Sequence, residues 1–231
     1  MRYNNLIIIG TSHVARQSLE EVEKKINEEK PEIIALELDN KRLYSLLHKK
    51  NEKRSSIYNI KNIGIKGWLF SLIGAWAEKK IGKIVGVMPG SEMLKAIRLA
   101  KEKNIKIALI DQDIEITLRR FSKELTWKEK MNFIIDILKA PFNKEIKKMN
   151  IDLTKVPDKK IINELIKKLK KRYPNIYKVL IHERNKIMAV NLRKLMKENP
   201  EKKILAIVGA GHEEELKRII SGNSHDITIA F

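Results

Sequence analysis

The sequence predicts an α/β fold: a mixed, largely parallel central sheet flanked by helices, with a helical insertion. Short apolar runs typical of buried strands alternate with amphipathic stretches typical of helices, as in parallel βαβ units. Polar residues follow four of the apolar runs, at the place where open α/β sheets bind ligands. With 231 residues, of which 43% are hydrophobic, the chain can bury the core of one large domain. We therefore expect a single domain over residues 1–231.

The first part of the chain is predicted to form strand, helix and strand. Residues 6–9 are the first buried strand and residues 33–38, with the sequence IIALEL, are the second. Between them, Ser18 is a good N-cap with Glu21 as its capping-box partner, so a helix is expected from there to about residue 29. This spacing predicts a parallel unit with a right-handed crossover.

Three segments of different character follow. Residues 40–50 are predicted to be helical, whereas residues 51–62 are polar and irregular, which is typical of a loop. Residues 68–77 are apolar, but about ten residues are too few to span a bilayer. We interpret this third segment as a helix packed in the domain or at a homodimer contact; a lid and an interfacial helix are the alternatives.

Most of the remaining chain is predicted to be helical. Ser91 is expected to cap a helix over residues 92–103, and residues 105–110 are predicted to be the third strand. A helical block then occupies about residues 114–200, punctuated by prolines. Its helices are predicted at residues 114–121, 127–139, 159–171 and 174–197, followed by a fourth strand at 203–208, a helix at 213–220 and a last strand at 226–230.

The composition restricts the classes of site and partner. The chain has no cysteine, so any metal must bind His, Asp or Glu. Abundant Lys, Ile and Glu with only two glutamines are typical of a thermophilic, archaeal, cytoplasmic protein. A formal net charge of +19 would suit nucleic acid or an anionic membrane surface. Because most lysines alternate with glutamates on polar helix faces, we favour a solvated surface and keep anionic binding as a third hypothesis.

The pattern Gly-x-x-His occurs twice, each time directly after a strand-like run. Gly10 begins the copy that ends at His13, and Gly209 begins the copy that ends at His212. Ten glycines and five histidines give only about 0.2 chance matches by composition. The two copies therefore predict that both histidines belong to one site at the carboxyl edge of the sheet. The alternative is ordinary turn chemistry at each glycine.

Charged residues accompany the histidines. Glu37 interrupts a buried apolar run, and a carboxylate there needs a metal, a cation or several donors. It is either a metal ligand or general base, or the partner of Arg42 or another cation. Glu92 begins a predicted helix, where the helix dipole alone stabilises a carboxylate. The same two interpretations, functional site or local structure, apply to Asp111, Asp113, Glu183 and Arg184.

Six short stretches, taken in order, carry a family resemblance. They are residues 10–14 (GTSHV), 35–39 (ALELD) with Arg42, 89–93 (PGSEM), 109–114 (LIDQDI) with Thr117 and Arg120, 183–185 (ERN) with Met188, and 209–212 (GAGH). Together they resemble the TraB/PrgY family of pheromone-shutdown proteins, which is similar to the Tiki metalloproteases and the GumN-like proteins. The resemblance covers nearly the whole chain and implies one TraB-like domain with an EreA/ChaN-like fold.

The resemblance also implies an activity and a set of residues. For the Tiki proteins it implies a metal-dependent protease, and for TraB and PrgY it implies inhibition of peptide-pheromone activity by degradation or sequestration. Many prokaryotic members carry membrane helices after the conserved domain, so membrane association through a region beyond this chain is an expectation. Gln112 stands where the family often has arginine. By position, the metal-site residues would be His13, Glu37, Glu92 and His212, with Arg120, Glu183 and Arg184 as supporting residues.

The leading hypothesis is a metal-dependent hydrolase that acts on peptides. The two histidines would bind a divalent ion together with Glu37 or Glu92, and the other glutamate would be the general base. Arg120 or Arg184 would stabilise the oxyanion or a substrate carboxylate. Ligands of these types do not separate Zn, Mn, Co and Fe. The rival hypothesis is a non-catalytic module that binds or sequesters a peptide in the same cleft.

Overall fold

The described part of the chain is organised around a five-stranded sheet in the order β1-β2-β5-β3-β4. The computed structural model describes residues 2–11, 16–48, 90–139 and 159–222. The short β1 is antiparallel to β2, whereas the other four strands are parallel to one another, which confirms the predicted mixed, largely parallel sheet. The strands are β1 (Arg2–Tyr3), β2 (Leu6–Thr11), β3 (Ile33–Leu36), β4 (Lys106–Leu109) and β5 (Ile204–Gly209).

The last strand of the described residues, β5, lies between β2 and β3. It pairs in parallel with β2 on one side and with β3 on the other. The two strands of the predicted strand-helix-strand unit, β2 and β3, are therefore not direct neighbours. In this register Gly10 is opposite Val208 and Thr11 is opposite Gly209. The two Gly-x-x-His motifs, about 200 residues apart in the sequence, therefore begin side by side.

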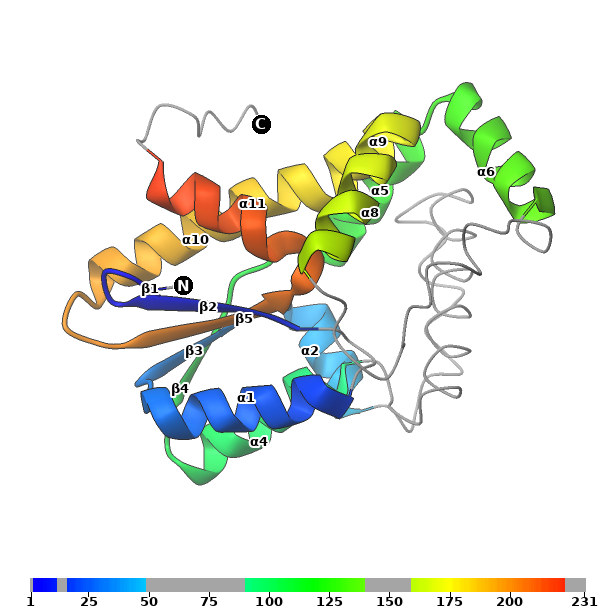
Figure 1. The fold of residues 1–231 in the computed structure, drawn as a ribbon. Coiled ribbons are helices and arrows are strands. Elements are labelled where there is room, and N and C mark those ends of the chain that lie inside the picture. Colours follow the sequence, from blue (N-terminus) through cyan, green and yellow to red (C-terminus); the bar gives the residue numbers. More distant parts are fainter. Residues whose placement is uncertain (1, 12–15, 49–89, 140–158, 223–231) are drawn as a thin grey trace.

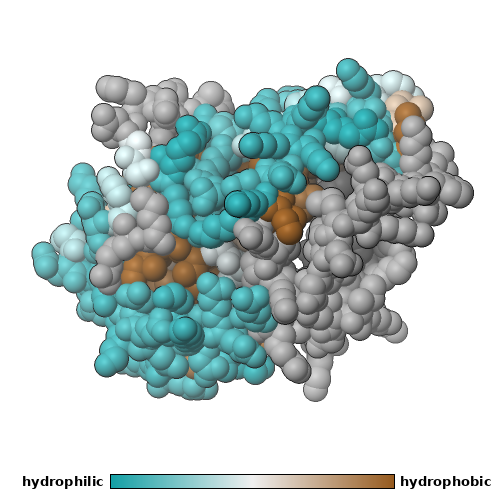
Figure 2. Space-filling model, in the orientation of Figure 1, coloured by the Kyte–Doolittle hydropathy of each residue, from teal (hydrophilic) through white to brown (hydrophobic). Residues whose placement is uncertain are grey.

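Helices cover both faces of the sheet, which explains why its central strands are apolar along their length. In Figure 1, α10 and α11 lie on one face and α1 and α4 on the other. The two cores receive alternate residues of β2, with Leu6 and Ile8 on the α10 side and Ile7 and Ile9 on the α1 side. Figure 2 shows hydrophobic side chains gathered between these hydrophilic helical layers.

Most of the predicted helices within the described ranges are confirmed. Three of the four in the helical block differ from their predicted ranges by at most three residues at one end. The helices are α1 (Arg16–Glu29), α2 (Asn40–Leu47), α4 (Ser91–Glu102), α5 (Ile114–Glu124), α6 (Trp127–Lys139), α8 (Lys159–Arg172), α9 (Pro174–Tyr177), the π-helical turn η3 (Lys178–His182), α10 (Glu183–Glu198) and α11 (Ala210–Ser221).

Two predicted helix caps are wrong. Ser18 is a buried residue inside the first turn of α1, which begins at Arg16. Gly90, and not Ser91, is the N-cap of α4, with a left-handed φ of 78° that favours glycine. A Cβ on Gly90 would also lie 2.6 Å from a methyl group of Leu46. Serine suits the first turn as well as the cap, so the sequence pattern did not distinguish these positions.

Two helices near the chain's end also differ from prediction. The expected helix over residues 174–197 is divided by the π-helical turn η3 between α9 and α10. The helix expected at 213–220 begins earlier, at Ala210, so His212 lies in the first turn of α11 and not in a loop. The histidine is thus held by a helix that starts directly at the end of β5.

Several predictions fall outside the described residues. These are the loop at 51–62, the apolar segment at 68–77, the last strand at 226–230 and His13. Within the described ranges, the helices are too short or too polar to cross a membrane.

Candidate functional site

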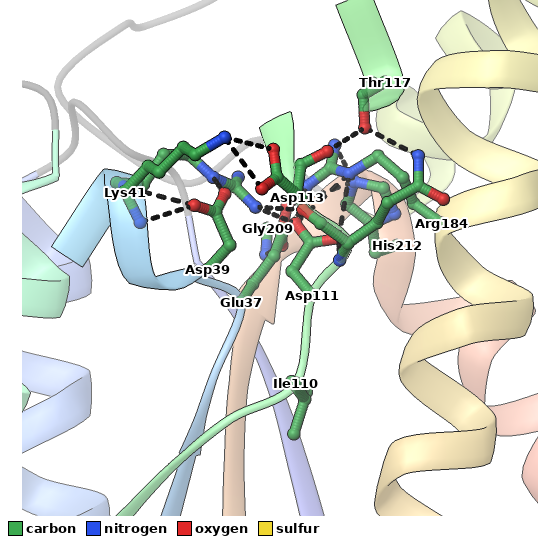
Figure 3. Close-up of polar contacts among 12 residues, drawn as sticks. Glu37, Asp39, Lys41, Ile110, Asp111, Asp113, Thr117, Arg184, Gly209 and His212 are labelled. Atoms are coloured by element: carbon green, nitrogen blue, oxygen red, sulfur yellow. Dashed lines mark hydrogen bonds and ion pairs between the residues drawn. The ribbon is translucent and has the colours of Figure 1, made fainter. Parts of the chain in front are cut away.

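The candidate site lies at the edge of the sheet where the parallel strands end. Glu37 follows β3, Asp111 follows β4, and His212 follows β5. α10 begins at the same edge and brings Arg184 to these three residues, as Figure 3 shows. The site thus has the position at which open α/β sheets bind ligands.

Glu37 is buried, with 4% of its surface exposed, and both of its oxygens are engaged. Oε2 accepts a hydrogen bond of 2.5 Å from the backbone N–H of Gly209. Oε1 pairs with Arg184 and lies 3.3 Å from Nε2 of His212. The buried carboxylate therefore has the cation and the donor that its burial requires, and the cation is Arg184 and not Arg42.

Arg184 uses all five of its N–H groups within the protein. Nε donates to Asp111 at 3.2 Å, and Nη1 donates to the carbonyl of Leu180 at 3.1 Å and to Nε2 of His212 at 3.2 Å. Nη2 donates to both Glu37 and Asp111. Burial alone would lower the pKa of Arg184, but the carboxylates of Glu37 and Asp111 outweigh it and raise this pKa.

Asp111 is shared by two arginines. Its side chain is fully buried, and Oδ2 accepts from Arg42 at 2.5 Å as well as from Arg184. Arg42 is itself held by Asp39 at 2.6 Å, which also caps α2 by accepting two backbone N–H groups. Burial alone would lower the pKa of Arg42, but its interactions with acidic residues, Asp111 first among them, outweigh burial and raise this pKa.

Among the described residues, the cluster has an excess of negative charge. These residues supply three carboxylates, those of Glu37, Asp39 and Asp111, and two guanidinium groups, those of Arg42 and Arg184. With neutral histidine the sum is three negative and two positive charges, or one net negative charge. Such a site favours an additional cation or proton.

His212 is held from the side opposite to Glu37. Its Nδ1 lies 2.7 Å from Oδ1 of Asn185, on α10. Nδ2 of the same amide donates to Glu215 at 2.8 Å. The imidazole therefore extends from α11 and is held by α10, with Nε2 toward the charged cluster.

A comparison with known proteins identifies the family. The model of the TraB/PrgY/gumN family matches residues 3–220. The chain belongs to this family. It is 39% identical to Uncharacterized protein MJ1365 of Methanocaldococcus jannaschii over 231 residues, which cover 96% of this chain and 56% of that protein. TraB domain-containing proteins of Bos taurus and Mus musculus are each 22% identical over 237 residues, covering 90% of this chain.

The predicted family membership is therefore confirmed, and the chain spans about 56–61% of the length of these relatives. The structure brings together three of the predicted TraB-family site residues: Glu37, Arg184 and His212. Arg120 and Glu183 form a separate pair, joined by two hydrogen bonds of 2.7 Å.

Glu92 is buried in the first turn of α4, a helix that also begins at the carboxyl edge because it precedes β4 and runs opposite to it. His13 lies outside the described residues, so the predicted short distance between the two imidazoles stays a prediction. Within the described ranges, no three His, Cys, Asp or Glu side chains form a group that could hold a metal ion.

Asn185, Glu215 and Asp39 are parts of the site that sequence reasoning missed. Asn185 and Asp39 lie inside stretches that carry the family resemblance, which is a signal that could have found them. Glu215 lies in a run of three glutamates at 213–215, and only the contact with α10 distinguishes it from its neighbours.

Proposed function

We propose that this chain is a metal-dependent hydrolase that acts on peptides, with His212 and Glu37 as two of the metal ligands. One observation carries the proposal: His212 Nε2 and Glu37 Oε1, from residues that follow different strands, lie 3.3 Å apart in a buried site. Tetrahedral ligands bonded at about 2.0–2.2 Å lie roughly 3.3–3.6 Å apart. The net negative charge of the cluster favours a cation in the same place.

The donor set fits such an ion in part. A catalytic zinc site has about three protein ligands, and the described residues supply two. His13 is the expected third ligand, because its motif begins beside that of His212 in the parallel register of β2 and β5. With nitrogen and carboxylate donors, the ion is Zn, Mn, Co or Fe.

In this mechanism the ion and the residues around it would have different roles. A bound divalent ion would polarise the scissile carbonyl and activate water. Glu92, which is buried in the first turn of α4, would be the general base. Arg120 would receive a substrate carboxylate, because its side chain is 39% exposed whereas every N–H of Arg184 is already engaged.

One observation favours the rival function, a module that binds or sequesters a peptide without cleaving it. Arg184 donates to both proposed ligand atoms, so the described cluster is satisfied without any ion. In this function the cluster would hold the surrounding elements rigidly in place while a peptide binds beside it. The two functions share the same residues and differ in metal content and in cleavage.

Metal analysis and peptide cleavage test the proposal together. Purified protein should contain about one divalent ion per chain, and a peptide library should be cleaved, as detected by mass spectrometry. His212→Ala and Glu37→Gln should lose both properties. His48→Ala removes an exposed histidine at the end of α2 and should lose neither. Absence of metal affinity would refute the metal-dependent mechanism, and saturable binding of intact peptides would support the rival.

A further inference from the structure

We infer that Asn185 and Glu215 are positioning residues that hold His212 as its Nδ1–H tautomer, with the Nε2 lone pair accepting from Arg184. The consequence for hydrolysis rests on the proposed function. The tautomer itself follows from the hydrogen bonds of the site and is measurable without any activity.

Glu215 determines how the amide of Asn185 is turned. An ionised carboxylate only accepts hydrogen bonds, and its Oε2 lies 2.8 Å from one end of the amide, which must therefore be the NH₂ group. The amide oxygen then faces His212, 2.7 Å from Nδ1. Because that oxygen can only accept, Nδ1 must carry the hydrogen.

Arg184 leads to the same tautomer from the other side of the ring. Its Nη1 lies 3.2 Å from Nε2 of His212, with hydrogen-bond geometry. A guanidinium group has donors and no acceptor, so Nε2 must accept. The two arguments use different atoms of neighbouring residues on α10, and both place the hydrogen on Nδ1.

The π-helical turn η3 explains why Glu215 is held so firmly. Tyr177 and His182, five residues apart, both bond to Glu215, at 3.0 Å and 2.7 Å. In an α-helix they would be about 140° apart around the axis, but a π-turn pairs residue i with i+5 and puts both on one face. Their rings accordingly stack, with centroids 6.4 Å apart.

The same contacts keep Glu215 ionised. Burial raises its pKa, but hydrogen bonds from His182, Asn185 and Tyr177 outweigh burial and lower it below the usual glutamate value. The chain of contacts therefore runs from the half-exposed His182 through Glu215 and Asn185 to the buried His212. Only the last member faces the charged cluster.

The tautomer matters for the chemistry of the site. An unprotonated Nε2 can bind a metal ion or accept a proton, whereas an Nε2–H group can do neither. Histidine ligands of metals commonly donate their other ring N–H to an oxygen that fixes the ring. Asn185 would have this role here, and Glu215 would fix Asn185.

Nitrogen-15 NMR of histidine-labelled, chelator-treated protein tests the inference directly, at a pH where imidazole is neutral. His212 should show a protonated Nδ1 and an unprotonated Nε2. Asn185→Leu and Glu215→Leu should lower the ratio of this tautomer to the other by about fivefold or more, the value of one ordinary hydrogen bond. Glu215→Gln should preserve it, because glutamine can still accept from Asn185 and donate to His182.

Asn191→Leu is the matched control, since Asn191 is also on α10 but bonds to the carbonyl of Ile110. It should leave the His212 signals in place. A wild-type spectrum showing Nε2–H or a doubly protonated ring would overturn the inference, even if the leucine variants did not fold. Unchanged ratios in folded Asn185→Leu would overturn it as well. Lack of metal or cleavage would instead count against the proposed function and leave this readout intact.

Discussion

Replacing Arg184 by methionine should destabilise the protein by about 3 kcal/mol, because it removes the cation from a buried carboxylate. Breaking a buried ion pair from one side costs roughly 3–5 kcal/mol. The lower end applies here, since Glu37 keeps the N–H of Gly209 and Asp111 keeps Arg42. For a chain of this size the melting temperature should fall by about 6–12 °C.

Chemical denaturation of a double-mutant cycle measures this effect. Glu37→Gln neutralises the orphaned carboxylate, so the double variant with Arg184→Met should be clearly more stable than the sum of the single variants predicts. Arg172→Met is the control, because Arg172 makes the same kind of two-fold contact with Asp136 at the surface. Solvent screens that exposed pair, and its loss should change stability little.

Two outcomes would refute the reasoning. In the first, Arg184→Met unfolds at the same denaturant concentration as the wild type, so that the pair stabilises nothing. In the second, the double variant is no more stable than the sum of the single variants predicts, so that the loss of stability in Arg184→Met does not come from an uncompensated charge on Glu37.

Two further predictions concern the scaffold. Burial raises the pKa of Glu129, but hydrogen bonds led by those from Asn175 outweigh it, so this pKa is lowered and the stability it confers is lost as pH falls. Between about pH 5 and pH 3 the wild type should therefore lose stability more steeply than Glu129→Gln in denaturation curves; equal slopes would contradict this. Gly10→Ala would place a Cβ 2.5 Å from Oε2 of Glu213 and should cost about 1–3 kcal/mol in thermal unfolding. Gly211→Ala, whose Cβ would come no closer than 3.6 Å to a neighbour, should cost less, and equal losses would exclude a steric cause.

Local patterns predicted the framework that positions the site. The apolar runs became the long parallel strands, and Glu37, Asp111 and His212 follow those strands as predicted. These predictions succeeded because strand periodicity and the shared edge of parallel strands depend on short stretches of chain and on general topology. The TraB-family resemblance, read from six short stretches, was confirmed in the same way.

The contacts within the site were beyond local patterns. Arg184 and Glu37 are 147 residues apart, and nothing near either residue distinguishes their pairing from one between Glu37 and Arg42. The π-helical turn before Glu183 has no signal in the helical periodicity, yet it places Tyr177 and His182 on Glu215. Partners of buried charges are chosen by which elements meet in space.

The sequence by itself determined the four parallel strands, most of the described helices, the family and the edge at which charged residues collect, because each of these depends on local periodicity or on short motifs. Only the tertiary structure decided that β5 enters between β2 and β3, which brings Gly10 and Gly209, the first residues of the two Gly-x-x-His motifs, side by side. It also decided that Arg184 is the cation between Glu37 and Asp111 and that Asn185 orients His212. A buried charge must find its partner among the groups that packing brings within about 3 Å, and packing depends on the whole chain.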